Sequence, residues 1–198
     1  MLLVGSFTFP FAQKVDAKAK TILETVSKNY KAKKYVLQIF LRNGNGKVSK
    51  TETGIFYSTP TQYKLNIMGN EQIFDGKKVY NISKEDQEVT IAQPNGSEKA
   101  LSPINYLDEY KTGYTVTYAG KSGGLDLIKM VPVKDNGVKS VVLYINTPKK
   151  QIAKIVQTSS GNDLAVITVN QYKENQSLSA STFSFDKNKY KNYLITEL

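Results

Sequence analysis

The chain has 198 residues, which suits a single domain, and 40% of them are apolar, which is enough to form a core. Cysteine and histidine are both absent, and this excludes disulfides, thiol nucleophiles, zinc sites built on these ligands and catalysis by a histidine base. The formal net charge of +10 comes almost entirely from scattered lysines, with Arg42 as the single arginine, which argues against a nucleic-acid reader. Such lysines indicate a solvated surface, and attraction to an acidic partner or to anionic lipid is the weaker alternative.

The N-terminal segment, MLLVGSFTFPFAQ, is a short apolar run that ends with the small residue Ala12. It is too short to span a bilayer, and it resembles the end of a secretory signal although the usual basic segment is missing. A buried N-terminal strand is the alternative. We therefore expect a signal over residues 1–12, a single domain over residues 13–198, and a location in the cell envelope.

Two segments have the periodicity of a helix. The first begins after Asp16, a residue type that caps helices, and carries one apolar face. That face consists of Ala19, Ile22, Leu23, Val26 and Tyr30. The second is shorter and begins at Ser102-Pro103, where proline suits the first helical turn. Its apolar face consists of Ile104, Leu107 and Tyr110.

Most of the remaining chain alternates with a period of two, which is typical of strands. Turns fall at residues 43–46 and at Pro60, and further strands follow the short helix up to STFSF, residues 181–185. About eleven strands and two helices indicate a mainly β fold, a single antiparallel meander that curls into a barrel or partial barrel. The apolar residues that we place on the inner faces of the first and third strands are Leu37, Ile39, Leu41, Tyr63, Leu65 and Ile67.

The segment EQIFDGKKVYNI, residues 71–82, predicts a hairpin with a two-residue turn at Asp75-Gly76. Both faces of this hairpin are partly apolar, so the pattern alone does not say which face is covered. The face that we expect to look into a cavity carries Ile73, Tyr80 and Ile82, and the opposite face carries Phe74 and Val79.

No group of polar residues converges on a catalytic arrangement. Asp108 and Glu109 are adjacent in the short predicted helix, where neighbouring residues do not face each other, and phosphate-binding glycine motifs are absent. We therefore expect no catalytic residue, no metal site and no cofactor, and we classify the protein as a non-enzyme. The aromatic and aliphatic residues then form either an ordinary core or a lipid-sized cavity under a helical lid.

Four segments, in this order, resemble the periplasmic outer-membrane lipoprotein carrier family, LolA. They are TGIFYSTPTQYKLNI around Pro60, the hairpin EQIFDGKKVYNI, the late hairpin pair VKSVVLYINTPKKQIAKIVQTSSGNDLAVITVNQY, and the terminal SASTFSFD. The resemblance extends over nearly the whole chain after residue 13. It implies a half-open antiparallel β-barrel whose helices form a small lid over an apolar cavity.

The resemblance also implies a periplasmic carrier that takes acylated lipoproteins from an inner-membrane exporter to an outer-membrane receptor. We therefore expect acylated lipoproteins and these two membrane proteins as partners, no nucleic acid, and a monomer. Two alternatives remain open. One is a periplasmic sensor or scaffold domain that binds a protein partner or a misplaced lipoprotein, and the other is a binder of a different hydrophobic ligand.

The expected lipid-binding residues come from both helices and from the early strands. They are Ile22, Leu23, Val26, Leu37, Ile39, Leu41, Ile55, Phe56, Tyr57, Tyr63, Leu65, Ile67, Ile73, Tyr80, Ile82, Ile104 and Leu107. Many members of the family carry a basic residue just before the proline that corresponds to Pro60, and this residue anchors the lid. Here that position is Thr59, so the expected lid contact at Thr59 and Pro60 brings no charge, and Lys64 is the alternative anchor.

Overall fold

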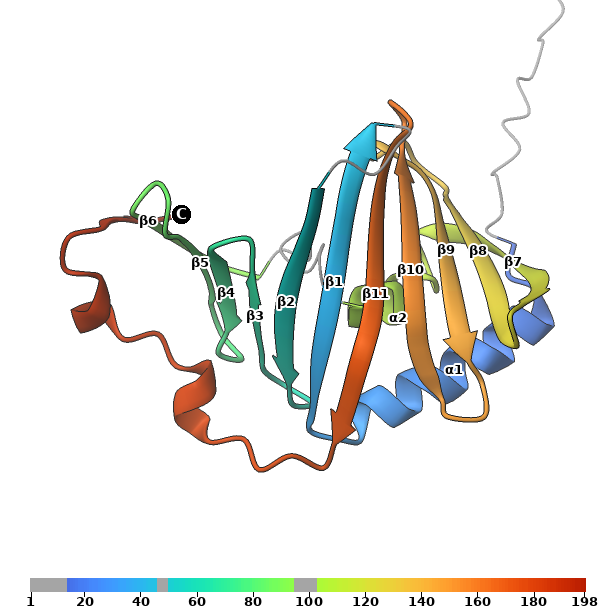
Figure 1. Cartoon of the computed structure of the whole chain (residues 1–198), viewed down its shortest axis with the longest axis horizontal. Coiled ribbons are helices and arrows are strands. Elements are labelled where there is room, and N and C mark those ends of the chain that lie inside the picture. The colour runs from blue at the N-terminus through green and yellow to red at the C-terminus, as the bar shows by residue number, and fades with distance from the viewer. Residues whose placement is uncertain (1–13, 46–49, 95–102) are drawn as a thin grey trace, which may run out of the picture.

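A computed structural model describes residues 14–45, 50–94 and 103–198, with the backbone alone described for residues 38–43, 45, 50 and 103–105 (Figure 1). The expected signal over residues 1–12 lies outside the described residues. Two α-helices are present in the described part of the chain, α1 (Ala17–Lys31) and α2 (Pro103–Glu109). The strands there are β1 (Tyr35–Asn45), β2 (Lys50–Ser58), β3 (Tyr63–Ile67), β4 (Asn70–Phe74), β5 (Val79–Ser83), β6 (Glu88–Ala92), β7 (Tyr114–Ser122), β8 (Leu125–Pro132), β9 (Val138–Asn146), β10 (Gln151–Ser159), β11 (Asp163–Glu174) and β12 (Leu194–Glu197).

All of these described strands form one sheet in the order β12-β6-β5-β4-β3-β2-β1-β11-β10-β9-β8-β7. Neighbouring strands are antiparallel, except that β12 runs parallel to β6. The edge strands β7 and β12 do not pair with each other, so the sheet curves without closing. This arrangement confirms the expected mainly β, half-open barrel with few helices.

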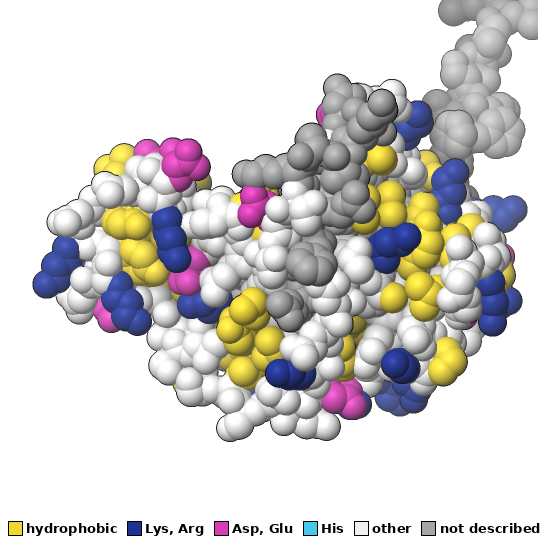
Figure 2. Space-filling view, in the orientation of Figure 1, with side chains coloured by type: hydrophobic (Ala, Val, Ile, Leu, Met, Phe, Trp, Pro, Cys, Tyr) yellow, Lys and Arg dark blue, Asp and Glu magenta, His cyan; other side chains and the backbone are white. Residues whose placement is uncertain are grey.

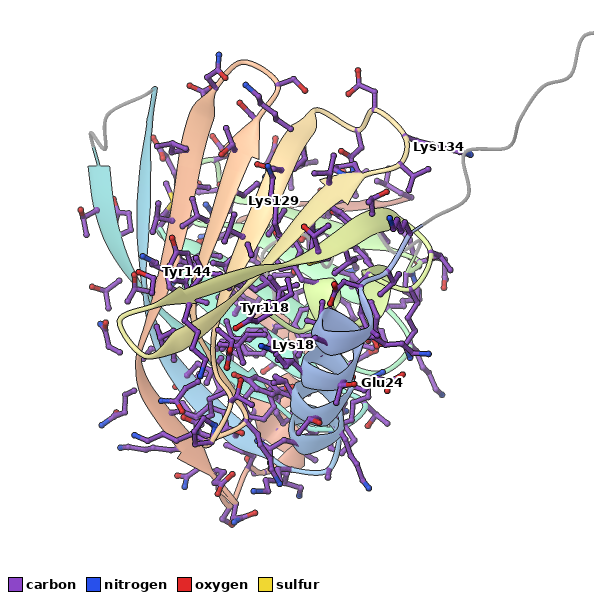
Figure 3. All side chains as sticks on the ribbon, turned by 90° about the vertical axis from the view of Figure 1, so that its right-hand side faces the viewer. Lys18, Glu24, Tyr118, Lys129, Lys134 and Tyr144 are labelled. Atoms are coloured by element: carbon purple, nitrogen blue, oxygen red, sulfur yellow. The ribbon has the colours of Figure 1, made fainter. Side chains whose placement is uncertain are left out.

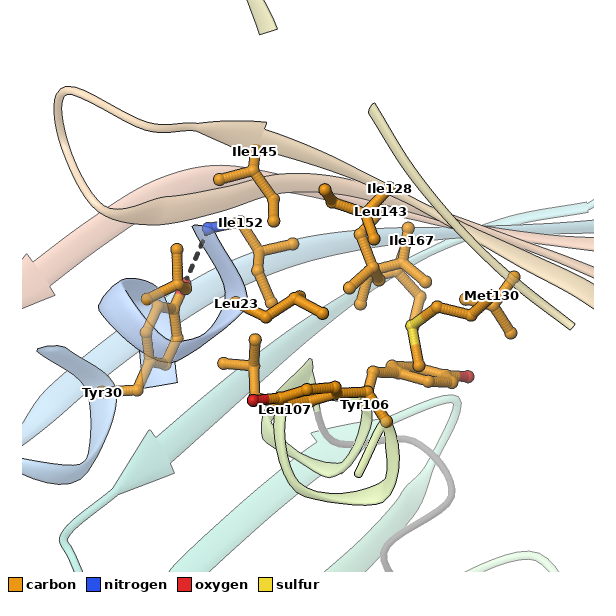
Figure 4. Close-up of a cluster of buried hydrophobic side chains, with 14 of the residues drawn as sticks. Leu23, Tyr30, Tyr106, Leu107, Ile128, Met130, Leu143, Ile145, Ile152 and Ile167 are labelled. Atoms are coloured by element: carbon orange, nitrogen blue, oxygen red, sulfur yellow. Dashed lines mark hydrogen bonds between the residues drawn. The ribbon is translucent and has the colours of Figure 1, made fainter. Parts of the chain in front are cut away.

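Helix α1 forms where the sequence predicts it. Asp16 caps it by accepting a hydrogen bond from the Ala19 backbone N–H at 2.9 Å. The apolar stripe is buried, with Leu23 and Val26 fully inaccessible to solvent. The Tyr30 hydroxyl accepts a hydrogen bond from the Ile152 backbone N–H at 3.2 Å, and this contact ties the end of α1 to strand β10 (Figure 4).

The main core lies between the two helices and the concave face of the sheet (Figures 1 and 4). Each strand from β1 to β3 and from β7 to β11 contributes alternate residues to it, as the pleat of a strand requires. Complete burial of one such apolar side chain contributes about 1.5–3 kcal/mol. The core residues that are fully inaccessible to solvent are Ala19, Leu23, Val26, Tyr35, Leu37, Phe56, Leu107, Val116, Ile128, Met130, Val141, Leu143 and Ile145.

A second, smaller core covers the convex face of strands β4 to β6. The chain after β11 forms two short 3-10 helices, η1 (Ala180–Phe183) and η2 (Lys187–Tyr190), and then β12. We call residues 179–198 the C-terminal arm. Phe185 of the arm stacks on Tyr80 with ring centroids 4.7 Å apart, and Tyr190 stacks on Phe185 at 5.3 Å. Beneath these rings lie Ile73, Ile82 and Val89.

The structure corrects three expectations. STFSF is not a strand, because η1 occupies most of it, and the short strand β12 was not predicted. The turn in EQIFDGKKVYNI has four residues, since Phe74 pairs with Val79. The faces of this hairpin are also reversed relative to the expectation, because its register continues that of β3. Ile73, Tyr80 and Ile82 therefore face the C-terminal arm, while Phe74 packs against the main core.

Asp75 organises this turn through its carboxylate. Oδ1 accepts hydrogen bonds from the backbone N–H groups of Lys77 and Lys78, both at 2.8 Å, and Oδ2 accepts one from the Tyr80 hydroxyl at 3.0 Å. Partial burial alone would raise the pKa of Asp75, but the hydrogen bonds from Lys78, Lys77 and Tyr80 together hold it below its usual value. The ionised carboxylate is therefore the form that stabilises the fold.

Substitution Asp75→Ala is predicted to lower the free energy of unfolding by about 1–2 kcal/mol at neutral pH, because two backbone donors lose their acceptor. Asp75→Asn keeps one acceptor oxygen and is predicted to lose less. Because the folded pKa is lowered, the charge contributes above the unfolded pKa of about 3.9 and its contribution disappears as the pH falls through the folded pKa. Urea unfolding at pH 7 and pH 3 checks both points. Equal stability of the three proteins at pH 7 would contradict the role of Asp75.

Candidate functional site

A row of aromatic rings crosses the concave face of five neighbouring strands. Tyr172 of β11 stacks on Tyr35 of β1 with ring centroids 5.7 Å apart, and Tyr35 lies 6.2 Å from Phe56 of β2. Phe56 stacks on Tyr63 of β3 at 5.8 Å, and Tyr63 lies 5.6 Å from Phe74 of β4. Since side chains on one face of a sheet are cross-strand neighbours, the row forms one continuous apolar surface.

Helix α2 lies over this concave face (Figure 1). Tyr106, Leu107 and Tyr110 are buried, and the Tyr106 hydroxyl donates a hydrogen bond to Gln157 Oε1 of β10. Burial raises the pKa of Tyr106, so this hydroxyl stays protonated and remains a donor. An ion pair between Lys31 and Asp108 joins the ends of the two helices. These few contacts hold α2 in place, since it is only seven residues long.

Beyond the helices, the concave face of β3 to β6 opens into a pocket with a volume of about 250 Å³. Its apolar side is formed by Leu65 and Ile67 of β3, which also belong to the main core. The side chains that face it from the other strands are Asn70, Gln72, Asn81, Ser83, Glu88 and Thr90. Glu71 and Ile82 also line the pocket, but they alternate with these residues along their strands, so their side chains point to the convex face.

The floor of the pocket is a chain of hydrogen bonds. The Tyr63 hydroxyl donates to Gln72 Oε1 at 3.1 Å, and Gln72 Nε2 donates to Asn81 Oδ1 at 2.7 Å. The pocket therefore joins an apolar wall to a polar floor, an arrangement typical of sites that bind an organic ligand.

The structure brings most of the predicted lipid-binding residues together on the concave face or on the helices that cover it. These residues are Ile22, Leu23, Val26, Leu37, Phe56, Tyr63, Leu65, Ile67 and Leu107, all of which belong to the main core. The side chains of Ile39, Leu41 and Ile104 lie outside the described residues.

Five of the predicted residues lie on the convex face instead. Ile55 and Tyr57 alternate with Phe56 along β2 and point away from the core, and 37% of Ile55 is exposed. Ile73, Tyr80 and Ile82 are covered by the C-terminal arm, as described above. None of the five shares a face with the pocket, because alternate residues of a strand lie on opposite faces.

Thr59 and Pro60 form the turn between β2 and β3. Thr59 Oγ1 accepts a hydrogen bond from the Gln62 backbone N–H at 2.9 Å, and the Thr59 backbone N–H donates to the Gln62 carbonyl at 2.9 Å. The described hydrogen bonds of Thr59 thus stay within the turn. Lys64, the alternative anchor, forms an ion pair with Glu71 at 2.9 Å on the convex face.

Sequence reasoning missed the polar floor. Gln72 and Asn81 share the face of Phe74 and Val79, which the sequence analysis expects to point away from the cavity, and that analysis does not name Thr90. The pairing of β4 with β3 and β5 reveals this polar floor, because Gln72 is the direct partner of both Leu65 and Asn81. A turn of two or of four residues puts Gln72 and Asn81 on one face, so the pairing of Gln72 with Leu65 of β3 decides that this face is the concave one.

A buried carboxylate, Asp126 of β8, lies elsewhere on the concave face. It accepts hydrogen bonds from Thr147 at 2.6 Å and from Tyr118 at 2.8 Å, and these bonds, that from Thr147 first, hold its pKa below the usual value. Lys18 of α1 lies 3.7 Å from the centroid of the Tyr118 ring (Figure 3). Asp126 therefore stays ionised and joins β8 to β7 and to the turn after β9, and it does not suit the role of a general acid.

Among the described residues, no cluster of three acidic side chains could hold a metal ion, and no helix is long and apolar enough to cross a membrane.

The sequence matches the family model described as outer membrane lipoprotein carrier protein LolA over residues 38–186, which is more than half of the chain. The chain belongs to the LolA family. The match runs from within β1 to just beyond η1, so it includes α2, the pocket and every member of the aromatic row except Tyr35. LolA-family proteins are carriers or binders, and the resemblance found in the sequence is confirmed by this match.

Solved structures show the same fold. An uncharacterized conserved protein from Thermus thermophilus superposes with a TM-score of 0.65 at 13% identity, covering 91% of this chain and 99% of that protein. MucB superposes with a TM-score of 0.50 at 11% identity, covering 86% of this chain and 64% of MucB. No curated protein matches the sequence.

Substitution Tyr106→Phe is predicted to loosen α2, because it removes the hydrogen bond to Gln157, which is worth about 1 kcal/mol. Hydrogen exchange of the α2 amides should become roughly fivefold faster, as that energy implies for local opening. Tyr172→Phe is the matched control, since it removes a tyrosine hydroxyl that contacts Asn29 of α1. Unchanged exchange in α2 of the Tyr106→Phe protein would show that this bond does not hold the helix.

Proposed function

We propose that this protein is a carrier of the cell envelope that binds the acyl chains of lipoproteins on its concave face and transfers them from the inner to the outer membrane. The observation that supports this proposal is the aromatic row, which continues from beneath the helices to the open pocket at Leu65 and Ile67. An acyl chain needs such a continuous apolar track, and it needs no catalytic group.

The energies are of the right size for reversible binding. Burial of one CH₂ group is worth about 0.8 kcal/mol, so burial of a dozen of them is worth about 10 kcal/mol. To make room beneath α2, the protein must expose Tyr106, Leu107 and Tyr110, at a cost of roughly 5–9 kcal/mol if each contributes about 1.5–3 kcal/mol. The free energy gained by burying the acyl chain therefore exceeds the cost of exposing the α2 side chains. The remaining binding free energy is small enough for the ligand to be released.

The size of the pocket supports movement of α2. Its volume of about 250 Å³ is below the roughly 300–1,000 Å³ of sites that enclose a drug-sized ligand. Next to the pocket, beneath the helices, Phe56 and Leu107 are packed without solvent access. A whole acyl chain therefore fits only if α2 moves, so that the side chains of α2 no longer cover the aromatic row.

Substitution Thr90→Trp is predicted to fill the pocket and to reduce extraction of a lipoprotein from liposomes by about tenfold, the equivalent of roughly two buried methylenes. Thr90 lines the pocket from β6 and is only partly buried, so the fold should accept the larger side chain. The measurement is the amount of acylated lipoprotein that co-elutes with the protein in the soluble fraction. Thr117→Trp, on an exposed position of β7, is the matched control.

Full extraction by the Thr90→Trp protein would contradict the assignment of the pocket. Extraction of free fatty acid or phospholipid in place of lipoprotein would favour a binder of another hydrophobic ligand. Tight binding of a protein partner with no acyl ligand in either protein would favour the sensor or scaffold alternative.

A further inference from the structure

Two rows of side chains on the concave face change from apolar to polar between β3 and β4, while the row of Tyr63, Phe74 and Val79 stays apolar. Leu37, Phe56 and Leu65 are direct cross-strand partners, and the same row continues through Gln72 and Asn81 to Thr90. A second row beside it runs from Ile67 through Asn70 and Ser83 to Glu88. Strands lie about 4.8 Å apart, so the polar part of each row extends for about 10 Å. The two rows together match an amphiphile, with the tail toward the helices and the head over β4 to β6.

One amide group of the pocket, that of Asn81, has an N–H donor available for a ligand. Gln72 is engaged on both sides, because its oxygen accepts from Tyr63 and its nitrogen donates to Asn81 Oδ1. This bond orients the Asn81 amide so that its Nδ2 group, which has no hydrogen-bond partner in the described residues, is left to donate. On the side away from Gln72, the cross-strand partner of Asn81 is Thr90, which also lines the pocket with a hydroxyl group. Both groups suit the carbonyl oxygen of an ester or an amide.

The charge around the polar end is negative, although the whole chain carries +10. Glu88 lines the pocket and is exposed, and the adjacent turn carries Glu85 and Asp86 against a single cation, Lys84. No lysine or arginine is among the described residues that line the pocket. Glu71 is neutralised on the other face by Lys64. Figure 2 shows acidic side chains gathered at the end of the lobe formed by β5 and β6.

We propose that this pocket selects acyl ligands whose head group is an uncharged ester or amide and rejects those with an anionic head. The inference rests on the proposed function, since it concerns the head of the ligand whose chain lies on the aromatic row. A phosphate or carboxylate placed at Asn81 and Thr90 would face Glu88 with no cation to pair with it. The glyceride esters and peptide amides of a lipoprotein carry no such charge, whereas the anionic phospholipids and free fatty acids of a membrane do. The pocket thereby keeps a carrier from filling with anionic lipid.

Two probes with the same C12 chain test this inference, N-dodecanoyl glycinamide as the neutral head and dodecanoate as the anion. Each displaces a neutral fluorescent naphthylamine from the protein at pH 7.5, and the ratio of the two dissociation constants is measured. The neutral probe should bind roughly threefold more tightly, the effect of two like charges about 7 Å apart in water, which is the spacing of Glu88 and Thr90 along β6. Glu88→Lys should reverse the preference. Glu24→Lys, which makes the same charge change on the exposed face of α1, should leave the ratio unchanged.

Equal affinity for the two probes, or a ratio that Glu88→Lys does not alter, would overturn the selection of uncharged heads while leaving acyl binding intact. Binding of neither probe by the folded protein would contradict the proposed function itself, and the inference with it. The two failures are therefore distinguishable.

Discussion

The structure depends on one constraint, which is that a curved sheet of this width has more concave surface than two helices can cover. Helix α1 covers the strands from β7 to β11 through Leu23, Val26 and Tyr30, and α2 adds Leu107 and its neighbours. The concave face of β3 to β6 extends beyond them. There the sheet replaces apolar residues by Gln72, Asn81 and Thr90, which tolerate water, and leaves an open pocket. The pocket therefore adjoins the aromatic row, because Leu65 of the pocket follows Tyr63 of the row on the same face of β3.

The C-terminal arm makes this open lobe stable. Strands β4 to β6 are each five residues long, and neither α1 nor α2, the two helices in the described part of the chain, lines the pocket on their concave face. The arm covers their convex face instead, with Phe185 and Tyr190 stacked over Tyr80 and with β12 paired along β6. Because Ile73, Ile82 and Val89 of this lobe are buried on the convex side, the concave side can carry the polar residues of the pocket. The position of the C-terminal arm therefore determines which face of β4 to β6 is covered and which face carries the polar residues of the pocket.

Local signals were sufficient for much of the fold. The cap at Asp16, the stripe of α1 and the alternation in β2 and β3 each depend on neighbouring residues, so the sequence predicted them and placed Leu65 and Ile67 correctly. The hairpin at Asp75 could not be resolved in this way. Both of its faces are half apolar, and the side that is covered is decided by the distant Phe185. Strand β12 was missed because its four residues pair in parallel with β6, and no pattern in the neighbouring residues indicates a pairing with so distant a strand.

The central claim is that the concave face carries an acyl chain whose uncharged head lies over Asn81 and Thr90. Native mass spectrometry of the protein purified from the envelope of its own host tests this claim most directly, because bound ligand is weighed with the protein. We expect a complex whose released ligand is an acylated peptide or lipoprotein. A protein that carries only anionic phospholipid, or that carries no acyl ligand in any envelope fraction, would contradict it.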